Sequence, residues 1–119
     1  MSAEVITRFF ESGSAGDIET AVDCFADDAQ WIAPEGSEPG TVYTKSEIGG
    51  LINEMNEMRE KMIASGMDGH FNPPVMFGEN EALVRWSVRT TDGKVIGRGV
   101  DLFVLREGKI VLKDVFRKA

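Results

Sequence analysis

Cysteine, histidine and basic residues are scarce in this sequence, and each shortage excludes a class of protein. Cys24 is the only cysteine, so an internal disulfide is excluded, which is typical of a reducing compartment. His70 is the only histidine, so we expect no Cys/His zinc site, no other metal and no cofactor. Lys and Arg number 13 against 20 Asp and Glu, a net charge of −7. This balance argues against a nucleic-acid partner, because phosphate binding needs clustered basic residues.

Long apolar runs are also missing. No run approaches the roughly 20 residues that a membrane-spanning helix needs, and the N-terminus lacks the basic, apolar and small-residue regions of a signal peptide. We therefore expect a cytoplasmic protein with no membrane partner. The 119 residues suffice for one domain with its own core and are too few for two, so residues 1–119 are expected to form a single domain.

Helical patterns dominate the first half of the chain. Apolar residues at helical spacing predict a helix over 2–11, and Asp17 is a suitable N-cap for a second helix. Thr44 and Glu47 have the spacing of a capping box at the start of a longer helix that ends at Gly66. The apolar side of that helix is expected to comprise Ile48, Leu51, Ile52, Met55, Met58 and Met62.

Strand patterns dominate the second half. A short strand is expected over 29–33, with Trp31 and Ala33 on one face, followed by a loop over 34–43. Turn residues then separate four further expected strands, over 69–77, 81–91, 94–105 and 109–117. Helices first and a meandering sheet afterwards indicate an α+β fold, with helices packed on one face of an antiparallel sheet.

Two aspartates, Asp101 and Asp114, interrupt the apolar pattern of the last two strands. If the turn at Glu107-Gly108 is a two-residue loop, Asp101 lies directly opposite Asp114, with Cβ atoms about 4.5–5.5 Å apart. Two like charges so close are destabilising unless they share a proton or are bridged, so the pair is a candidate acid/base dyad. A one-residue bulge would instead separate them, and in another alternative one carboxylate pairs with Arg98 or Lys113 at the sheet edge.

The face of the last strand bears on the role of Asp114. Ile110, Leu112, Asp114 and Phe116 share the more apolar side, which should face the helices. Asp114 is therefore expected to be buried in a cavity, where a carboxylate tends to have a raised pKa.

The direction of Arg85 depends on the turn at residues 91–94. The alternation of residues 81–91, taken alone, puts Trp86 inside and Arg85 outside. A two-residue loop sets Val84 opposite Asp101 and leaves Arg85 outside. A three-residue loop with a glycine bulge brings Arg85 to the face of Asp101.

Three segments resemble the SnoaL-like and ketosteroid-isomerase-like branch of the nuclear-transport-factor-like superfamily: Phe9-Phe10, the run from Ala15 to Trp31, and the run from Gly108 to Phe116. The resemblance implies a cone in which a curved sheet wraps a long helix and encloses one apolar pocket, usually in a homodimer. Members include isomerases, polyketide cyclases, epoxide hydrolases, dehydratases and non-catalytic proteins, so the fold does not identify the reaction.

The resemblance to ketosteroid isomerases is incomplete at the catalytic positions. Ala33 stands where the family has its aspartate base, and Phe9 stands where it has the tyrosine that donates to the enolate oxygen. Asp101 matches the protonated aspartate of the oxyanion hole, which an apolar site keeps neutral so that it can donate a hydrogen bond. We therefore reject the isomerase reaction unless another base substitutes.

Epoxide hydrolases and cyclases offer a second comparison. Arg85 and Asp114 match the arginine and one aspartate of the limonene-type hydrolases, whereas Ser87 stands at the other aspartate. SnoaL-type cyclases also resemble this chain in placing an acid/base aspartate in the strand of Asp114.

These patterns predict a protein that binds a small apolar molecule in an enclosed pocket. Cofactor-free hydrolysis, isomerisation or cyclisation would use Asp114 as the principal acid/base, with Asp101 and Arg85 in support. The alternative is a non-catalytic ligand-binding or dimerisation module that has lost the family's catalytic residues. The expected pocket residues are Phe9, Trp31, Ala33, Met55, His70, Ser87, Phe103, Leu112 and Phe116.

An apolar surface on the other side of the sheet predicts a homodimer. If the helices cover one face, the opposite face would be left exposed in a monomer, and such patches usually mark interfaces. Its expected residues are Val100, Leu102, Val104, Val111 and Val115.

Overall fold

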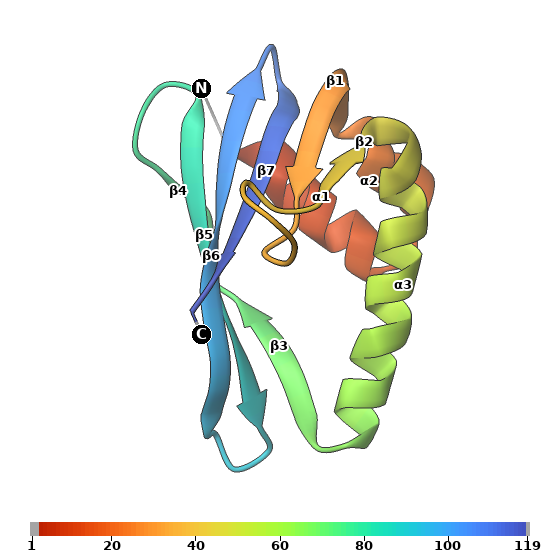
Figure 1. The fold of residues 1–119 in the computed structure, drawn as a ribbon, viewed down its shortest axis with the longest axis vertical. Helices are drawn as coiled ribbons and strands as arrows, with labels where there is room; N and C mark the ends of the chain where they lie inside the picture. The colour runs from red at the N-terminus through yellow and green to blue at the C-terminus, as the bar shows by residue number, and fades with distance from the viewer. Residues whose placement is uncertain (1–2, 119) are drawn as a thin grey trace.

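The computed structural model describes residues 3–118, which form three helices and seven strands (Figure 1). The helices are α1 (Glu4–Ser14), α2 (Ile18–Asp23) and α3 (Lys45–Ala64). The strands are β1 (Phe25–Ile32), β2 (Val42–Thr44), β3 (Met67–Phe71), β4 (Val75–Met76), β5 (Glu81–Thr90), β6 (Val95–Arg106) and β7 (Lys109–Arg117).

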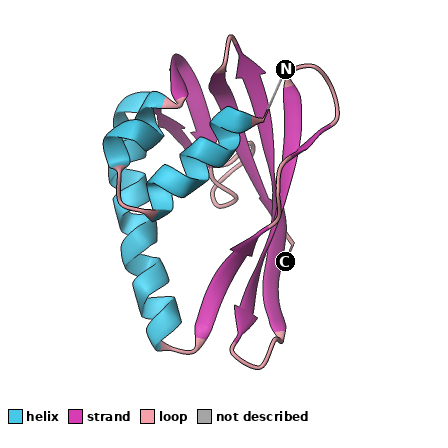
Figure 2. Ribbon diagram, turned by 180° about the vertical axis from the view of Figure 1, so that it is seen from behind, coloured by secondary structure: helices cyan, strands magenta, loops and turns pink. Residues whose placement is uncertain are grey.

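The strands form one mixed sheet in the order β2-β1-β7-β6-β5-β3, with β4 also paired to β5. The helices lie together on one side of this sheet (Figure 2), called here the inner face. The predicted α+β fold is confirmed. The sheet is mixed, because β1 runs parallel to β7 whereas every other pairing is antiparallel. The helix-then-sheet pattern did not include this pairing, because it joins strands at opposite ends of the chain.

The predicted starts of the second and third helices are confirmed. The Asp17 side chain accepts a hydrogen bond from the Thr20 backbone N–H, 3.3 Å away, and caps α2. The capping box of α3 is present, with the Thr44 N–H donating to Glu47 Oε1 over 2.9 Å. The first helix begins at Glu4, and Ser2, which we had included in it, lies outside the described residues.

Two predicted strands have different bounds. The strand expected over 29–33 is β1, which begins at Phe25 and ends before Ala33. The strand expected over 69–77 is two strands, β3 and β4, separated by a segment that contains Pro73 and Pro74. Proline has no N–H to donate to a neighbouring strand, which explains the interruption.

The core lies between α1 and the inner face of β1, β6 and β7. Phe9 of α1 is at its centre, with ring centroids of Phe25 at 5.2 Å, Trp31 at 5.7 Å and Phe103 at 6.5 Å. The contacts to Phe25 and Trp31 are edge-to-face, the arrangement that aromatic rings favour. This cluster fixes α1 on the sheet.

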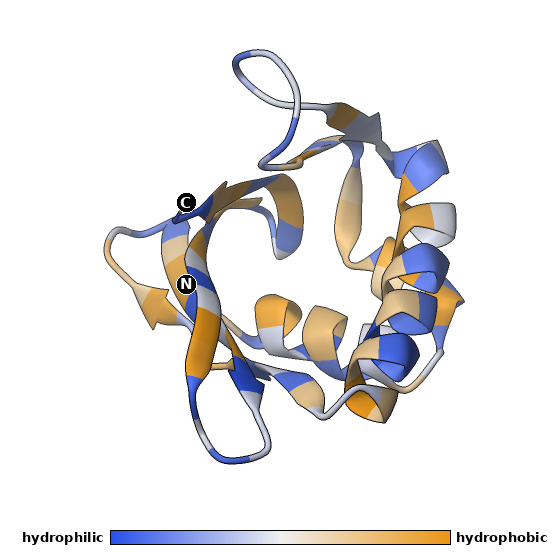
Figure 3. Ribbon diagram, turned by 60° about the horizontal axis from the view of Figure 1, so that its bottom comes forward, coloured by the Kyte–Doolittle hydropathy of each residue, from blue (hydrophilic) through white to orange (hydrophobic). Residues whose placement is uncertain are grey.

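Only the first half of α3 is packed into the core. Ile48 and Ile52 are buried, but Met55 is 46% and Met58 is 64% exposed, so the expected apolar side extends too far along the helix. In the view of Figure 3, α3 stands across from β5 and β6, and it approaches the sheet beside β1, β2 and β3. Met55 and Met58 therefore lie outside the packed side of the helix, whereas Met62 is partly buried.

Candidate functional site

One extra residue in β7 decides which side chains face the core. The turn between β6 and β7 is the predicted two-residue loop, because Arg106 pairs with Lys109. The pairing then shifts by one: Leu105 pairs with Ile110 but Val104 pairs with Leu112, so Val111 is a bulge. Beyond the bulge, every side chain of β7 points to the face opposite to the one we predicted.

The expected pairing of Asp101 with Asp114 is therefore wrong. Asp101 lies opposite Val115, and Asp114 lies opposite Leu102 on the outer face of the sheet. Lys113 takes the inner position instead, opposite Phe103 of β6 and Trp31 of β1. The alternative in which an aspartate pairs with Lys113 names the correct partner. The pair does not lie at the sheet edge, however, because Lys113 is buried on the inner face with only 3% exposed.

Asp101 and Lys113 form a buried ion pair. Lys113 Nζ lies 3.2 Å from Asp101 Oδ2, and Trp86 Nε1–H donates to Asp101 Oδ1 over 3.0 Å. Lys113 and Trp86 are diagonal neighbours of Asp101 on β7 and β5, within reach for long side chains. Each carboxylate oxygen thus has a donor, which is the condition for a tolerable buried charge.

Aromatic rings surround the lysine end of this pair. Lys113 Nζ is 3.9 Å from the Trp31 ring centroid, 5.8 Å from that of Phe103 and 6.0 Å from that of Phe9. The negative ring faces attract an ammonium ion. Burial nevertheless lowers the pKa of Lys113 below its ordinary value, and the charge and hydrogen bond of Asp101 oppose this effect without cancelling it.

Trp86 connects the ion pair to side chains exposed to solvent. It is partly buried and lies opposite Phe71 of β3, whose side chain is 49% exposed and whose ring centroid is 4.6 Å from that of Phe10. Trp86 also lies directly over Gly99, where a Cβ atom would overlap the indole ring. Trp86 thus lies between the buried carboxylate of Asp101 and the exposed side chain of Phe71.

Three predicted pocket residues come together at this site: Phe9, Trp31 and Phe103, all buried. Ala33 does not join them, because it lies beyond the end of β1, where its N–H donates to the Thr41 carbonyl over 2.9 Å. Met55 is exposed on α3.

The three predicted residues of β7 that were expected in a cavity lie on the outer face. Leu112 and Asp114 are partly buried, and Phe116 is 50% exposed. Partial burial and, secondarily, the charge of Glu38 raise the pKa of Asp114. The raised pKa agrees with our expectation, but the position does not. Asp114 lies on the outer face, away from the helices, and Asp101 lies on the inner face.

Arg85 also points to the outer face, opposite Val100. The Thr90 N–H donates to the Lys94 carbonyl, so the turn has three residues. A bulge between Val95 and Gly97 then shifts the pairing back by one residue, and Val84 lies opposite Asp101. Two irregularities thus cancel, and Arg85 remains where strand alternation alone places it.

Ser87 and His70 pair with each other across β5 and β3, on the same outer face as Arg85. Ser87 is buried beneath Arg89, whose Nε–H donates to Ser87 Oγ over 3.0 Å, and His70 is exposed. Neither side chain lies with the ion pair.

Lys113 and Trp86 are the site residues that sequence reasoning missed. The alternation of β5 alone did place Trp86 inside, next to the face of Asp101. A signal for Lys113 would have required the position of the bulge, because a lysine next to an aspartate in a terminal strand otherwise indicates an exposed pair.

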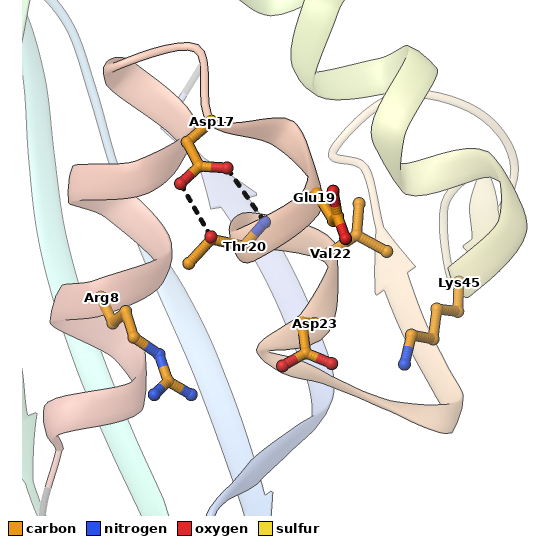
Figure 4. Close-up of a pocket in the computed structure, with 7 residues that line it drawn as sticks. All are labelled: Arg8, Asp17, Glu19, Thr20, Val22, Asp23 and Lys45. Atoms are coloured by element: carbon orange, nitrogen blue, oxygen red, sulfur yellow. Dashed lines mark hydrogen bonds between the residues drawn. The ribbon is translucent and has the colours of Figure 1, made fainter.

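A surface depression of about 730 Å³ is lined by side chains of α1, of α2 with its N-cap, and of the start of α3 (Figure 4). Four of its five charged side chains bond within the protein: Asp17 accepts from Thr20, Lys45 lies 3.3 Å from Asp27, Asp23 lies 3.4 Å from Lys109, and Arg8 Nε donates to the Cys24 sulfur at 3.5 Å. The lining residues are Arg8, Asp17, Glu19, Thr20, Val22, Asp23 and Lys45.

Neither a metal cluster nor a membrane helix is found within residues 3–118. No three His, Cys, Asp or Glu side chains of this part are grouped to hold a metal ion. None of its helices combines the length and apolar character that crossing a bilayer requires.

Comparison with solved structures identifies the fold. The chain is similar to an NTF2-like protein of unknown function from Mesorhizobium loti, with 19% identity and a TM-score of 0.74 over 98% of this chain and 90% of the other. It is also similar to a candidate polyketide cyclase from Sinorhizobium meliloti, with 18% identity and a TM-score of 0.70 over 94% and 93% of the two chains. A candidate isomerase of the SnoaL-like family from Agrobacterium tumefaciens shares 17% identity, with a TM-score of 0.65 over 96% and 95%.

These identities establish a common fold and no common reaction. No protein of curated function matches the sequence. The SnoaL-like domain pattern, however, matches residues 6–113, nearly the whole chain. The chain is therefore a member of the SnoaL-like domain family, with the NTF2-like, cystatin-like α+β fold.

Proposed function

We propose that this protein binds a small, largely apolar molecule with one polar oxygen and acts on it by cofactor-free acid/base chemistry. The ligand would lie on the inner side of β3 and β5, against Trp86 and Phe71, and its oxygen would point toward Asp101 and Lys113. The observation that supports this proposal is the buried Asp101–Lys113 pair, 3.2 Å apart, next to exposed apolar side chains.

The cost of burying charge supports a functional role for the pair. Removing each ion of a pair from water costs several kcal/mol. Well-packed apolar residues of similar volume often stabilise a fold as well as a buried ion pair does, or better. A core that already contains Phe9, Trp31 and Phe103 could be completed with apolar side chains. An ion pair at this position is therefore better explained by chemistry than by stability.

The pair has the parts of a proton donor and acceptor. The Lys113 ammonium can donate a hydrogen bond to a ligand oxygen as negative charge develops on it. Asp101 can accept a proton once Lys113 turns toward the ligand. This assignment replaces the earlier one, in which Asp114 was the principal acid/base and Asp101 a neutral hydrogen-bond donor.

A non-catalytic binding module is the second candidate. Both Asp101 oxygens have donors, and the side chains of Asp101 and Lys113 are only 3% and 4% exposed. Asp101 is thus engaged within the protein and shielded from a ligand, and this favours binding without turnover.

Titration with uncharged alcohols and ketones of six to ten carbon atoms, roughly the size of a single ring system, tests both candidates. The indole N–H of Trp86 reports directly on the site, because it donates to Asp101. We expect its NMR signal to shift saturably with at least one ligand, and we expect Asp101→Asn to weaken this response. Asp114→Asn is the matched control, since it makes the same change on the outer face.

Turnover then separates the two candidates. Conversion of a bound ligand that is lost in Asp101→Asn and kept in Asp114→Asn supports the enzyme. Saturable binding with no conversion across the panel supports the binding module. An indole signal that no ligand moves refutes both.

A further inference from the structure

We infer that Lys113 is a nucleophilic lysine that forms an imine with a small apolar aldehyde or ketone. This inference rests on the proposed function and goes beyond it, because it names the substrate class and gives the reaction a covalent step. It is carried by the enclosure of Lys113 Nζ among three aromatic rings, with a carboxylate 3.2 Å away.

The surroundings of Lys113 differ from those of the other lysines. Lys45 and Lys109 have 25% and 38% of their side chains exposed and form surface ion pairs, and Lys61, Lys94 and Lys118 are exposed. Only a neutral amine attacks a carbonyl, and lysine nucleophiles are activated by desolvation in an apolar pocket. The direction of the pKa shift at Lys113 agrees with such activation.

Asp101 supplies the proton transfers that imine formation needs. The Lys113 ammonium first gives one proton to Asp101 Oδ2, which leaves a neutral pair. The amine nitrogen then attacks the carbonyl carbon, and the electron pair of the C=O π bond moves to the oxygen. A proton passes from nitrogen to this oxygen, which becomes a hydroxyl. The Asp101 carboxyl returns its proton to that hydroxyl, which leaves as water, and the nitrogen lone pair forms the C=N bond. The product is a protonated imine beside the Asp101 carboxylate, so atoms and charge balance.

Trp86 and the aromatic rings define which carbonyl compounds fit. The Trp86 N–H holds Asp101 Oδ1 and leaves Oδ2 directed at Lys113, so the carboxyl is oriented for the transfer. Phe71 and Phe10, which contact each other beside Trp86, offer apolar surface to the rest of the molecule. We therefore expect preference for an uncharged aliphatic or aromatic carbonyl compound over a charged keto acid.

Reductive trapping tests this inference. The full chain is incubated with cyclohexanone or benzaldehyde, reduced with sodium cyanoborohydride, and mapped by peptide mass spectrometry. Lys109, four residues away on the same strand, is the internal control and needs no variant. We expect Lys113 to be labelled about tenfold faster than Lys109 or more, because desolvation activates an amine nucleophile.

Two variants separate a nucleophile from a merely buried amine. Lys113→Arg keeps the positive charge and must abolish the label at position 113, and Asp101→Asn is expected to reduce labelling of Lys113 while Asp114→Asn leaves it unchanged. Binding of cyclohexanol, followed by the Trp86 indole signal, is measured in parallel because an alcohol cannot form an imine.

The outcomes distinguish the inference from the proposed function. Label at Lys113 that depends on Asp101 supports the inference. Cyclohexanol binding with label confined to the exposed lysines overturns the inference and leaves the proposed function standing. Absence of both binding and label at Lys113 overturns both.

Discussion

Lys113 Nζ lies 3.2 Å from Asp101 Oδ2, and less than one twentieth of either side chain is exposed. These residues meet only because Val111 is an extra residue in β7. Without the bulge, Asp114 would occupy the inner face and Lys113 the outer one. A shift of one residue in a strand moves every following side chain to the other face, so the bulge determines the chemistry of the core.

Breaking the ion pair should strongly destabilise the fold. Asp101→Asn leaves the Lys113 charge buried without its counter-ion, and such changes cost about 3–5 kcal/mol in free energy of unfolding. Urea denaturation followed by far-ultraviolet circular dichroism measures the loss. Asp114→Asn, the same substitution on the outer face, should lower the free energy of unfolding by no more than about 0.5 kcal/mol.

Removing both charges should restore stability. In Asp101→Leu combined with Lys113→Met, no unpaired charge remains, and the double variant should be more stable than either single variant. A double-mutant cycle with additive effects would show that the two charges do not interact in solution.

Stability should rise with pH in alkaline solution because of Lys113. Burial lowers its pKa in the fold. Between that lowered value and the ordinary value of about 10.4, the unfolded chain binds a proton that the folded chain does not. The free energy of unfolding must therefore increase with pH across this window.

The Asp101→Leu/Lys113→Met double variant serves as the reference for this experiment, since it retains all the exposed lysines. We expect the stability difference between wild type and this variant to shift in favour of wild type from pH 7 to pH 10. A difference that is constant with pH would contradict the lowered pKa of Lys113.

Gly99→Ala should displace Trp86. A Cβ at this position would overlap both the Trp86 ring and the Phe116 carbonyl oxygen, so the indole and the strand must move. Overpacking of this kind typically costs about 1–3 kcal/mol. Gly97→Ala is the matched control on the same strand, because its Cβ would meet only Val88 at an ordinary 4.0 Å.

Denaturation and the NMR signal of the Trp86 indole N–H measure the effect of these two glycine variants. We expect the signal to move in Gly99→Ala and to stay in place in Gly97→Ala. Equal stability of the two variants would mean that the contact between Trp86 and Gly99 is not maintained.

The outer face of the sheet is expected to mediate a homodimer. Leu83 is 37% and Phe116 is 50% exposed there, and the neighbouring Leu102 and Leu112 are partly buried. This surface differs from the one expected from sequence, because Val115 faces the core and Leu112 and Phe116 take its place. Leu102→Glu should yield a monomer in size-exclusion chromatography with light scattering, whereas a wild-type monomer at micromolar concentration would refute the dimer.

Asp114 should make this association depend on pH. Partial burial and Glu38 raise its pKa, so its neutral form is more populated in mildly acidic solution than that of an ordinary aspartate. The neutral form costs less to bury, and the dimer should tighten as the pH falls through this range. The Asp114→Asn variant should dimerise as tightly at neutral pH as the wild type does in acid. The concentration dependence of the dimer fraction measures this.

Local sequence patterns were sufficient for the elements and the fold class. The capping box of Thr44 and Glu47, the N-cap Asp17 and the turn at Glu107-Gly108 depend only on residues within a few positions of each other. Strand alternation likewise placed Trp86 inside and Arg85 outside. Such features are local because their hydrogen bonds and steric limits act between near neighbours in the chain.

The site required the tertiary structure. The pairing of β1 with β7 brings Trp31 beside Lys113 across about two thirds of the chain, and no local pattern encodes that contact. Beyond the bulge at Val111, Lys113 lies on the inner face among rings of α1, β1 and β6, so its neighbours come from elements far apart in the sequence. Sequence alone thus determined that an aspartate would stand within an apolar strand face, and the three-dimensional packing decided that its partner is a lysine, because the face that each side chain occupies depends on the register of the whole sheet.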